Sequence, residues 1–471
     1  MINHKNKIFL LISISFLLSV SAYSQDSLFY YLNIACKNNP AVLQKFNEYK
    51  ASLQKIPQVG SLPDPELSTG VFLSPMELVA GKQVADIRLM QMFPWFGVLK
   101  NARDEMSLMA KAKYESFRES RLQLFYSVQR TWNELQKVRQ TIRINEENLK
   151  ILQSLERLSV SRFKAAPPIG GSSSGSQVFK GNSASPVTGS SGMNSMGGNP
   201  EAVTKTSAPP MPSSPMGSSG GSGLAEVYRI QMEIGELENN LSLLKSQQQT
   251  ISVRFNSYLN RSPRLEVNVP EVLSADSLTN SLSAVSDSMF RQSPMLEMLR
   301  YEEQSLESRK KMVSRMGYPM VGVGLNYSVI QKNQMPTSGM NGSDMIMPMM
   351  TITLPIYRKK YKAMREEVSL LQESTKKGIQ QTANSLQNEY YEAIQFYQDA
   401  RRRLKLYQNQ SALAGKTLNI LMKSYSASGS DLSELLRIRQ QTLDYELKQI
   451  EAITDNNMAI AWLKKLSCGE R

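Results

Sequence analysis

The feature that most constrains this chain of 471 residues is an internal duplication. A helical segment (NNPAVLQKFNEYKASL) precedes two alternating stretches, PDPELSTGVFL and VADIRLMQMFPWF, and a long helical run then opens at Leu99. The order recurs near residue 293 as QSPMLEMLRYEEQSL, YPMVGVGLNYSVI and MIMPMMTITLPIY, followed by a long helical run from Arg358. Two copies of one helix–strand–strand–helix unit indicate a repeat protein.

The N-terminal residues indicate export. Lys5 and Lys7 precede an apolar run over residues 8–20, and small residues follow at Ala22 and Ser24. This pattern is typical of a secretory signal peptide, here over residues 1–24, and the apolar run is too short to span a bilayer. The rest of the chain has no apolar run of about twenty residues, so we expect no spanning helix.

The formal charge of +14 does not point to nucleic acid. Lys and Arg alternate with Glu and Gln along the helical runs, as in Arg300-Tyr301-Glu302-Glu303. This arrangement is typical of solvated helix faces. We therefore expect no nucleic-acid partner.

The first long helical run, residues 99–164, has a seven-residue ladder of Val128, Leu135, Ile142 and Leu149. Such a ladder predicts a coiled-coil seam, which is too narrow for the core of a globular domain. We therefore expect the long helices to pack side by side in a bundle.

Four stretches have the length and alternation of strands that cross a bilayer at a tilt. They span residues 65–73, 83–93, 319–330 and 346–354. Four strands cannot close a barrel, and open sheet edges are not tolerated in lipid. Several copies of the chain are therefore expected to contribute to one membrane β-barrel.

The duplication also sets the domain boundaries. Leu224 to Ile230 aligns with Leu432 to Ile438 at the tips of two helical hairpins. A short SGSD turn joins the second hairpin, whereas a Gly-, Ser-, Pro- and Met-rich tract interrupts the first, and its composition predicts disorder. The first repeat is expected at 25–260, with the tip insertion at 166–223 and the return helix at 224–260. A linker follows at 261–275. The second repeat is expected at 276–471, with its long helix at 358–426 and its return helix at 431–466.

The duplicated hairpins, the four alternating strands and the signal peptide resemble the TolC family of outer-membrane efflux channels. The phrase SGSDLSELLRIRQQTL is similar to that family's hairpin-tip signature. The Met-rich strand pair and the stretch MIMPMMTITLPIYRKKY resemble most closely its heavy-metal branch, which exports copper and silver or cobalt, zinc and cadmium. The resemblance covers the mature chain apart from residues 166–223.

This resemblance implies a mainly α fold with a membrane β-barrel portion. In a homotrimer, four strands per chain complete a 12-stranded barrel, and the tandem helical hairpins form an α-barrel tunnel through the periplasm. It also implies three kinds of partner: outer-membrane lipid, a periplasmic adaptor protein and an inner-membrane pump of the RND type. The channel itself is passive and needs no cofactor.

Some members of the family have two acidic residues three apart at the tip, which form an anionic constriction. Here Glu434 aligns with the first and Arg437 replaces the second, while Asp431 adds a nearby carboxylate. Glu226 and Arg229 repeat the pattern in the first hairpin. Rings of these acids would concentrate cations at the gate. The alternative is that they are favourable acids in the first turn of a helix.

The 26 methionines cluster in two places. Thioether sulfur favours Cu(I) and Ag(I), so the methionines of the tip insertion are candidates for transient metal contact. They are Met193, Met196, Met211 and Met216. We interpret the second group, Met347, Met349 and Met350, as filling packing or lipid-facing positions.

The strand ends and the cysteines supply the remaining candidate sites. Family resemblance makes Pro94, Trp95 and Phe96, with Pro355 and Tyr357, the joint where strands bend into helices; a membrane-interface girdle of aromatics is the alternative. An oxidising compartment permits a disulfide between Cys36 and Cys468, and two free buried thiols are the other outcome. These assignments rest on the printed sequence alone.

Enzymatic activity is not expected. The chain's only histidine is His4, inside the signal peptide, and no CxxC or complete phosphate-binding loop is present. The sequence thus predicts an efflux channel for heavy-metal cations. Two alternatives remain open: a drug, dye or type I protein secretion duct of the same fold, and a periplasmic coiled-coil scaffold without a pore.

Overall fold

The computed structural model assigns the elements of both repeats. The predicted signal peptide, Asp431 and residues 166–221 of the predicted insertion lie outside the described residues. The chain divides into two compact units. The first consists of Met1–Ile144 and Ser242–Arg471, and the second is Asn145–Leu241, which contains the tip of the first hairpin. The described residues are 27–78, 80–165, 222–270, 272–279, 281–332, 334, 342–427 and 432–468.

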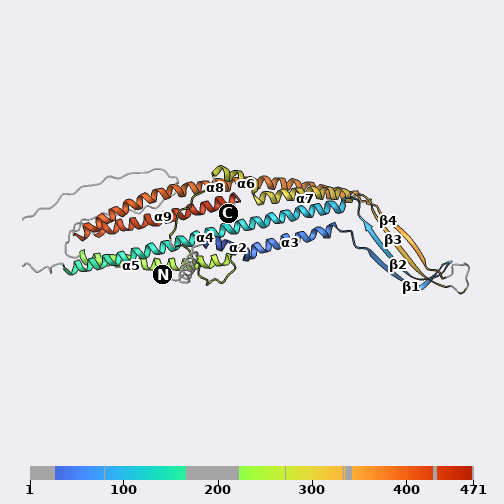
Figure 1. Ribbon diagram of the computed structural model, residues 1–471, viewed down its shortest axis with the longest axis horizontal. Helices are drawn as coiled ribbons and strands as arrows, with labels where there is room; N and C mark the ends of the chain where they lie inside the picture. The colour runs from blue at the N-terminus through green and yellow to red at the C-terminus, as the bar shows by residue number, and fades with distance from the viewer. Residues whose placement is uncertain are drawn as a thin grey trace, which may run out of the picture. The chain divides into compact units, whose positions relative to one another are not determined.

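The two halves of the chain have the same order of elements (Figure 1). The first half consists of α2 (Ser27–Asn38), α3 (Pro40–Gly60), β1 (Glu66–Leu78), β2 (Gly81–Phe93), α4 (Val98–Ala165) and α5 (Ser222–Tyr258). The second half consists of α6 (Leu282–Gln292), α7 (Pro294–Met316), β3 (Met320–Gln331), β4 (Met345–Thr353), α8 (Arg358–Ser426) and α9 (Leu432–Leu466).

Helix α3 of the first half and its counterpart α7 of the second half begin in the same way. At the start of α3, the side chain of Asn39 accepts hydrogen bonds from the backbone N–H groups of Ala41 and Val42, and Pro40 follows it. At the start of α7, Ser293 caps the N–H of Leu296 and a proline again follows. A polar cap followed by proline is a strong helix-start signal, so the duplication extends to how individual helices begin.

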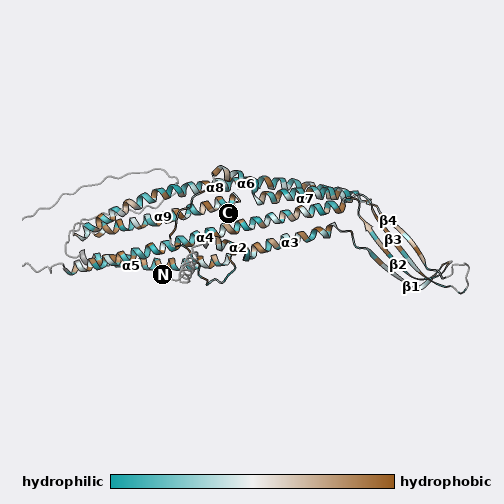
Figure 2. Cartoon of the chain, viewed as in Figure 1, coloured by the Kyte–Doolittle hydropathy of each residue, from teal (hydrophilic) through white to brown (hydrophobic). Residues whose placement is uncertain are grey.

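The long helices pack through narrow apolar stripes. Helix α4 has 68 residues and would extend about 100 Å at 1.5 Å per residue. Val128, Leu135 and Ile142 of its seven-residue ladder are buried. Figure 2 shows apolar positions interspersed with polar ones along the helices. This is the pattern expected of bundled helices rather than of a broad globular core.

Each repeat has its own apolar core. In the first repeat the side chains come from α2, α3, α4, α5 and the segment after α5, and in the second repeat mainly from α6, α8 and α9. The first core is built around Tyr31, Val128, Trp132, Leu135 and Phe255. The second is built around Met289, Tyr390, Tyr397, Ile460 and Leu463.

Polar side chains fix the segment that connects the repeats. Buried Asn457 of α9 accepts from the backbone N–H of Asp276 and donates to the carbonyl of Ser274, both at 2.8 Å. Its neighbour Asn456 donates to the carbonyl of Asp276 at 3.0 Å. Arg139 of α4 donates to the carbonyl of Val269. The connection is thus bound to helices of both repeats.

The four strands form one antiparallel sheet in the order β1-β2-β3-β4. Strand β1 continues five residues past the predicted end at residue 73. Its pairing with β2 shifts register between Val71 and Met76, a stretch that contains Pro75. Proline cannot donate a ladder hydrogen bond and is tolerated at an edge strand or bulge, which explains why the strand extends past it.

The two faces of the sheet differ in chemistry. One face carries large apolar side chains that are exposed in the single chain; we call it the apolar face: Leu67, Val71, Ile87, Leu89, Val323, Leu325, Ile346 and Ile352. The opposite face, here called the polar face, carries Glu66, Ser68, Asp86, Arg88, Asn326 and Ser328. The polar face also carries methionines, but charged side chains and amides are found on it, as is typical of a sheet with two different environments.

Among the described residues, none of the helices combines the length and apolar character needed to cross a membrane.

The structure has no disulfide between Cys36 and Cys468. Ala35, next to Cys36, belongs to the core of the first repeat, and Leu466, two residues before Cys468, belongs to that of the second. Cys468 is buried and its thiol contacts the carbonyl of Leu466. The two free thiols thus adjoin the cores of different repeats.

Candidate functional site

The predicted joint residues lie between strand and helix in both repeats. Pro94, Trp95 and Phe96 follow β2, and Pro355 and Tyr357 follow β4. The exposed fractions of Phe96 and Tyr357 are 82% and 77%. Such exposed aromatic side chains at strand ends suit contact with a lipid interface or with another chain.

Trp95 and Phe96 contact the end of α7 and the residues that follow it. The Trp95 ring stacks on Tyr318 with the centroids 5.2 Å apart. Arg315 donates to the carbonyl of Phe96 at 2.8 Å. Gly97 then has φ +84, and a Cβ there would meet the Arg315 guanidinium. The bend therefore requires glycine and fixes the start of α4 against α7.

A hollow of about 720 Å³ lies beside this joint, and half of its lining residues are basic. Lys310, Lys311 and Arg315 come from α7, and Arg365 comes from α8. The single acid in the lining, Glu307, accepts a hydrogen bond from Gln372, which lowers its pKa and keeps it ionised. The net positive charge suits anionic groups such as phosphates.

At the tip of the second hairpin, the predicted gate residues lie in the first turns of α9. Exposed Glu434 is paired with Arg437, whose Nη2 donates to Oε1 at 2.8 Å. Asp431 lies outside the described residues. The pairing means that the carboxylate of Glu434 is partly compensated within its own helix.

The tip of the first hairpin belongs to the second compact unit. Glu226 is half-buried and Arg229 is exposed, both in the first turns of α5. One turn later, burial raises the pKa of Glu233, while the charge of Arg229 acts to lower it. Gln231 donates to Glu156 of α4 at 2.7 Å, which ties the two arms of this hairpin.

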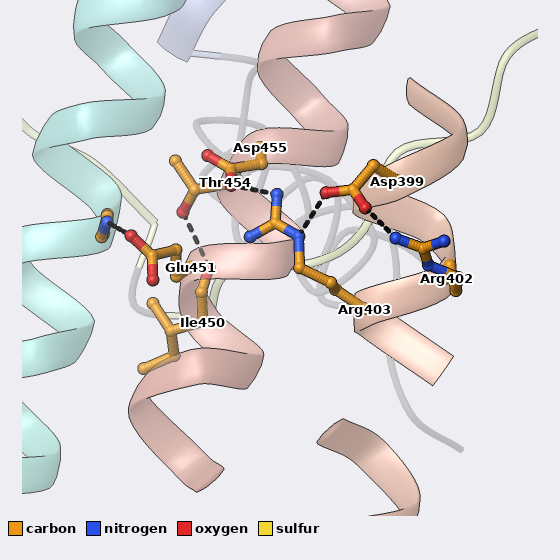
Figure 3. A network of polar contacts seen from close by, with 8 residues as sticks. Asp399, Arg402, Arg403, Ile450, Glu451, Thr454 and Asp455 are labelled. Carbon is orange, nitrogen blue, oxygen red and sulfur yellow. Dashed lines mark hydrogen bonds and ion pairs between the residues drawn. The ribbon is translucent and has the colours of Figure 1, made fainter. Parts of the chain in front are cut away.

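Figure 3 shows an ion-pair network between α8 and α9. Arg403 donates to Asp399 at 2.7 Å and to Asp455 of α9 at 2.8 Å. Arg402 also pairs with Asp399 but is 80% exposed. The hydrogen bond from Arg403 holds the pKa of Asp399 below its ordinary value. Arg403 thus joins the helices of the second hairpin through two carboxylates.

An ion pair between α4 and α9 links the two repeats near this network. Lys137 of α4 donates to Glu451 of α9 at 2.8 Å. The pair lies at the edge of the network in Figure 3, where Glu451 points away from Arg403. The heptad pattern predicts neither this ion pair nor the Arg403 network. It indicates which apolar positions are buried, but not which charged side chains meet between helices.

Metal ligands of the ordinary kind are not grouped in the described part of the chain. No cluster of three or more His, Cys, Asp or Glu side chains occurs there. The candidate methionines Met193, Met196, Met211 and Met216 lie outside it. Of the second methionine group, Met347 and Met349 lie on the polar face and Met350 lies on the apolar face.

No protein-family model matches the sequence. The search of curated proteins likewise gave no match.

Solved structures do resemble the chain closely in fold. The outer-membrane channel OprN has a TM-score of 0.70 at 12% identity, over 94% of this chain and 90% of that one. CusC, described as forming a transmembrane channel, has a TM-score of 0.69 at 12% identity, over 94% and 92%. The open state of the MtrE outer-membrane channel of Neisseria gonorrhoeae has a TM-score of 0.67 at 13% identity, over 94% and 89%. At such low identity the likeness establishes the fold, and the predicted fold class is confirmed.

Proposed function

We propose that this chain, which has the fold of the TolC-type outer-membrane channels, is itself the outer-membrane channel of a tripartite efflux system. It acts as a passive homotrimeric duct in the bacterial outer membrane and extends into the periplasm. The observation that carries this proposal is the sheet, whose strands have 9 to 13 residues and whose faces separate apolar from polar side chains. Strands of this length cross a bilayer when tilted.

The edges of the sheet support the trimer. Strands β1 and β4 each pair on one side only within the chain. An unpaired strand edge leaves N–H and C=O groups unsatisfied, which is costly in lipid. Three chains in a ring would pair β1 of one with β4 of the next and close a 12-stranded barrel. The apolar face would then meet lipid and the polar face would line the lumen.

The joint suits the inner boundary of that membrane. Exposed Phe96 follows Trp95, which lines the basic hollow, and exposed Tyr357 directly precedes α8, which supplies Arg365 to that hollow. Aromatic and basic side chains together are typical of the headgroup level of a bilayer. Beyond this level the long helices form the tunnel, which docks a periplasmic adaptor and an RND-type inner-membrane pump at the hairpin tips.

At the tips, we assign Glu226, Glu434 and Asp431 to a cation-attracting gate, with Arg229 and Arg437 setting its strength. The ion pair between Glu434 and Arg437 supports regulation of that charge rather than a fully anionic ring. The tip methionines Met193, Met196, Met211 and Met216 are assigned to transient contact with Cu(I) or Ag(I). Titration of an isolated 166–223 peptide with Ag(I) tests this, and absence of heat rejects it.

The cargo we propose is heavy-metal cations. Growth of a deletion strain on copper, silver, zinc, cobalt, a dye and a detergent tests it. Sensitivity confined to metals supports the proposal, whereas sensitivity to dye and detergent assigns the same duct to general export. Membrane fractionation with chemical cross-linking tests the assembly itself: we expect trimers in the outer-membrane fraction, and monomers in the soluble periplasm would favour a scaffold without a pore.

A further inference from the structure

The methionines of the sheet are distributed unevenly between its two faces. Antiparallel partners point to the same side of a sheet, so the regular register assigns seven methionines to a face; Met76 lies beyond the register shift of β1 and is left out. The apolar face has Met350, which pairs with Val323. The polar face has Met90, Met92, Met320, Met345, Met347 and Met349. Methionine used as lipid-facing filler would gather on the apolar face, and these do not.

Two glycines let the thioethers converge. Met90 of β2 and Met349 of β4 are both paired with Gly324 of β3, one from each side. The Sδ of Met90 lies 3.2 Å from the point that a Gly324 Cβ would occupy, and the Sδ of Met92 lies 2.5 Å from that point on Gly322. The sulfur atoms of Met90 and Met92 therefore lie over β3, on the face of the sheet that Met349 of β4 shares.

The strand geometry repeats this arrangement along the sheet. Met345, Met347 and Met349 alternate along β4, at a spacing of about 7 Å on one face. Met90 and Met92 run along β2 in the same way. In a closed trimer the methionine rows of β2 and β4 would each occur three times around the lumen. Several weak sites in series are what a conducting pathway requires, because each ion must leave as readily as it enters.

We propose that these polar-face methionines form a thioether ladder that binds soft monovalent cations, Cu(I) or Ag(I), as they cross the outer membrane. The inference rests on the proposed channel function and names its substrate class. Thioether sulfur selects Cu(I) over harder divalent ions. Zinc, cobalt and nickel ordinarily take imidazole, thiolate or carboxylate ligands, and the only histidine of the sequence is His4.

The test uses purified full-length protein and Ag(I) as the probe. The ladder variant replaces Met90, Met92, Met347 and Met349 with leucine, which nearly conserves volume. The control variant replaces four exposed methionines outside the ladder: Met232, Met295, Met316 and Met350. By equilibrium dialysis, we expect the ladder variant to bind less Ag(I) than native protein, keeping only what the remaining methionines hold, and the control variant to bind as much as native protein. Equal binding by all three proteins overturns the proposal.

Conductance separates failure of the ladder from failure of the channel. Planar bilayers are recorded in potassium nitrate, because chloride precipitates Ag(I). We expect micromolar Ag(I) to reduce or interrupt the current through native and control channels and to leave the ladder variant unaffected. If all three proteins conduct normally and Ag(I) changes the current of none of them, the thioether ladder is rejected while the channel function stands. Native protein without conductance overturns the proposed function.

Discussion

Arg403 of α8 donates to Asp455 of α9 at 2.8 Å, and this contact unites the two helices of the second hairpin (Figure 3). Its guanidinium also donates to Asp399, so two carboxylates share one cation. Because Asp455 is mostly buried and Arg403 is about one-quarter exposed, solvent screens this pair less than a surface pair. Helix packing at this level depends on a charge as well as on the apolar seam.

Arg403→Ala is therefore expected to destabilise the protein by about 1.5–3 kcal/mol, since it removes charge-assisted hydrogen bonds and leaves Asp455 without its cation. Arg402→Ala is the matched control, because Arg402 pairs with the same Asp399 but is 80% exposed. Its expected cost is below about 1 kcal/mol. Thermal unfolding in detergent compares the two, and equal losses would contradict the assigned role.

The bend between β2 and α4 gives a second prediction. Gly97→Ala places a side chain at φ +84 and against the guanidinium of Arg315. We expect a loss of about 1–2 kcal/mol from the backbone alone. Gly415→Ala is the control: that glycine lies mid-helix in α8 with open space around it, so the change should stabilise by about 0.5–1 kcal/mol. A neutral Gly97→Ala variant would show that the bend tolerates other conformations.

The tip ion pair predicts opposite effects on ion selectivity. Arg437→Gln frees the carboxylate of Glu434 and should raise the preference for cations over anions. Glu434→Gln should lower that preference. Reversal potentials in asymmetric salt measure both. Identical potentials for the two variants and the native channel would remove these residues from the gate.

Glu119 of α4 predicts a pH effect. Burial raises the pKa of Glu119 above its ordinary value of 4.5, against the smaller effect of Lys465. The folded protein then binds this proton more tightly than the unfolded chain, so stability falls as pH rises from 4.5 through the folded-state pKa. Glu119→Gln should therefore raise the melting temperature at neutral pH, and the gain should vanish as pH falls toward 4.5.

Asp399→Asn serves as the control of opposite sign. The pKa of Asp399 is lowered by its hydrogen bond from Arg403, so its ionised form stabilises the fold at neutral pH. The substitution should lower the melting temperature there. If both substitutions shift the melting temperature at neutral pH in the same direction, they contradict the account in which burial destabilises ionised Glu119 and pairing with Arg403 stabilises ionised Asp399.

Much of the fold could be predicted because its signals are local. The alternation at 83–93 and the heptad from Val128 depend only on neighbouring residues, and the structure places β2 at Gly81–Phe93 and buries Val128. The extension of β1 past Pro75 was missed, since the register shift that accommodates it involves the partner strand.

The candidate site could be predicted only in part, because its contacts are between distant segments. The pairing of Met90 with Gly324 and of Gly324 with Met349 depends on a register that no single strand specifies. Likewise, nothing near Lys137 in the sequence indicates that it meets Glu451, over three hundred positions away. Asp431 and the tip methionines lie outside the described residues, so their roles stay predictions.

The most direct test of the channel proposal is single-channel recording of the purified full-length protein in a planar bilayer. The proposal predicts discrete, uniform conductance steps from a trimeric species. Trimers that insert into the bilayer yet give no defined conductance would contradict it and would assign the sheet to anchoring rather than to a pore.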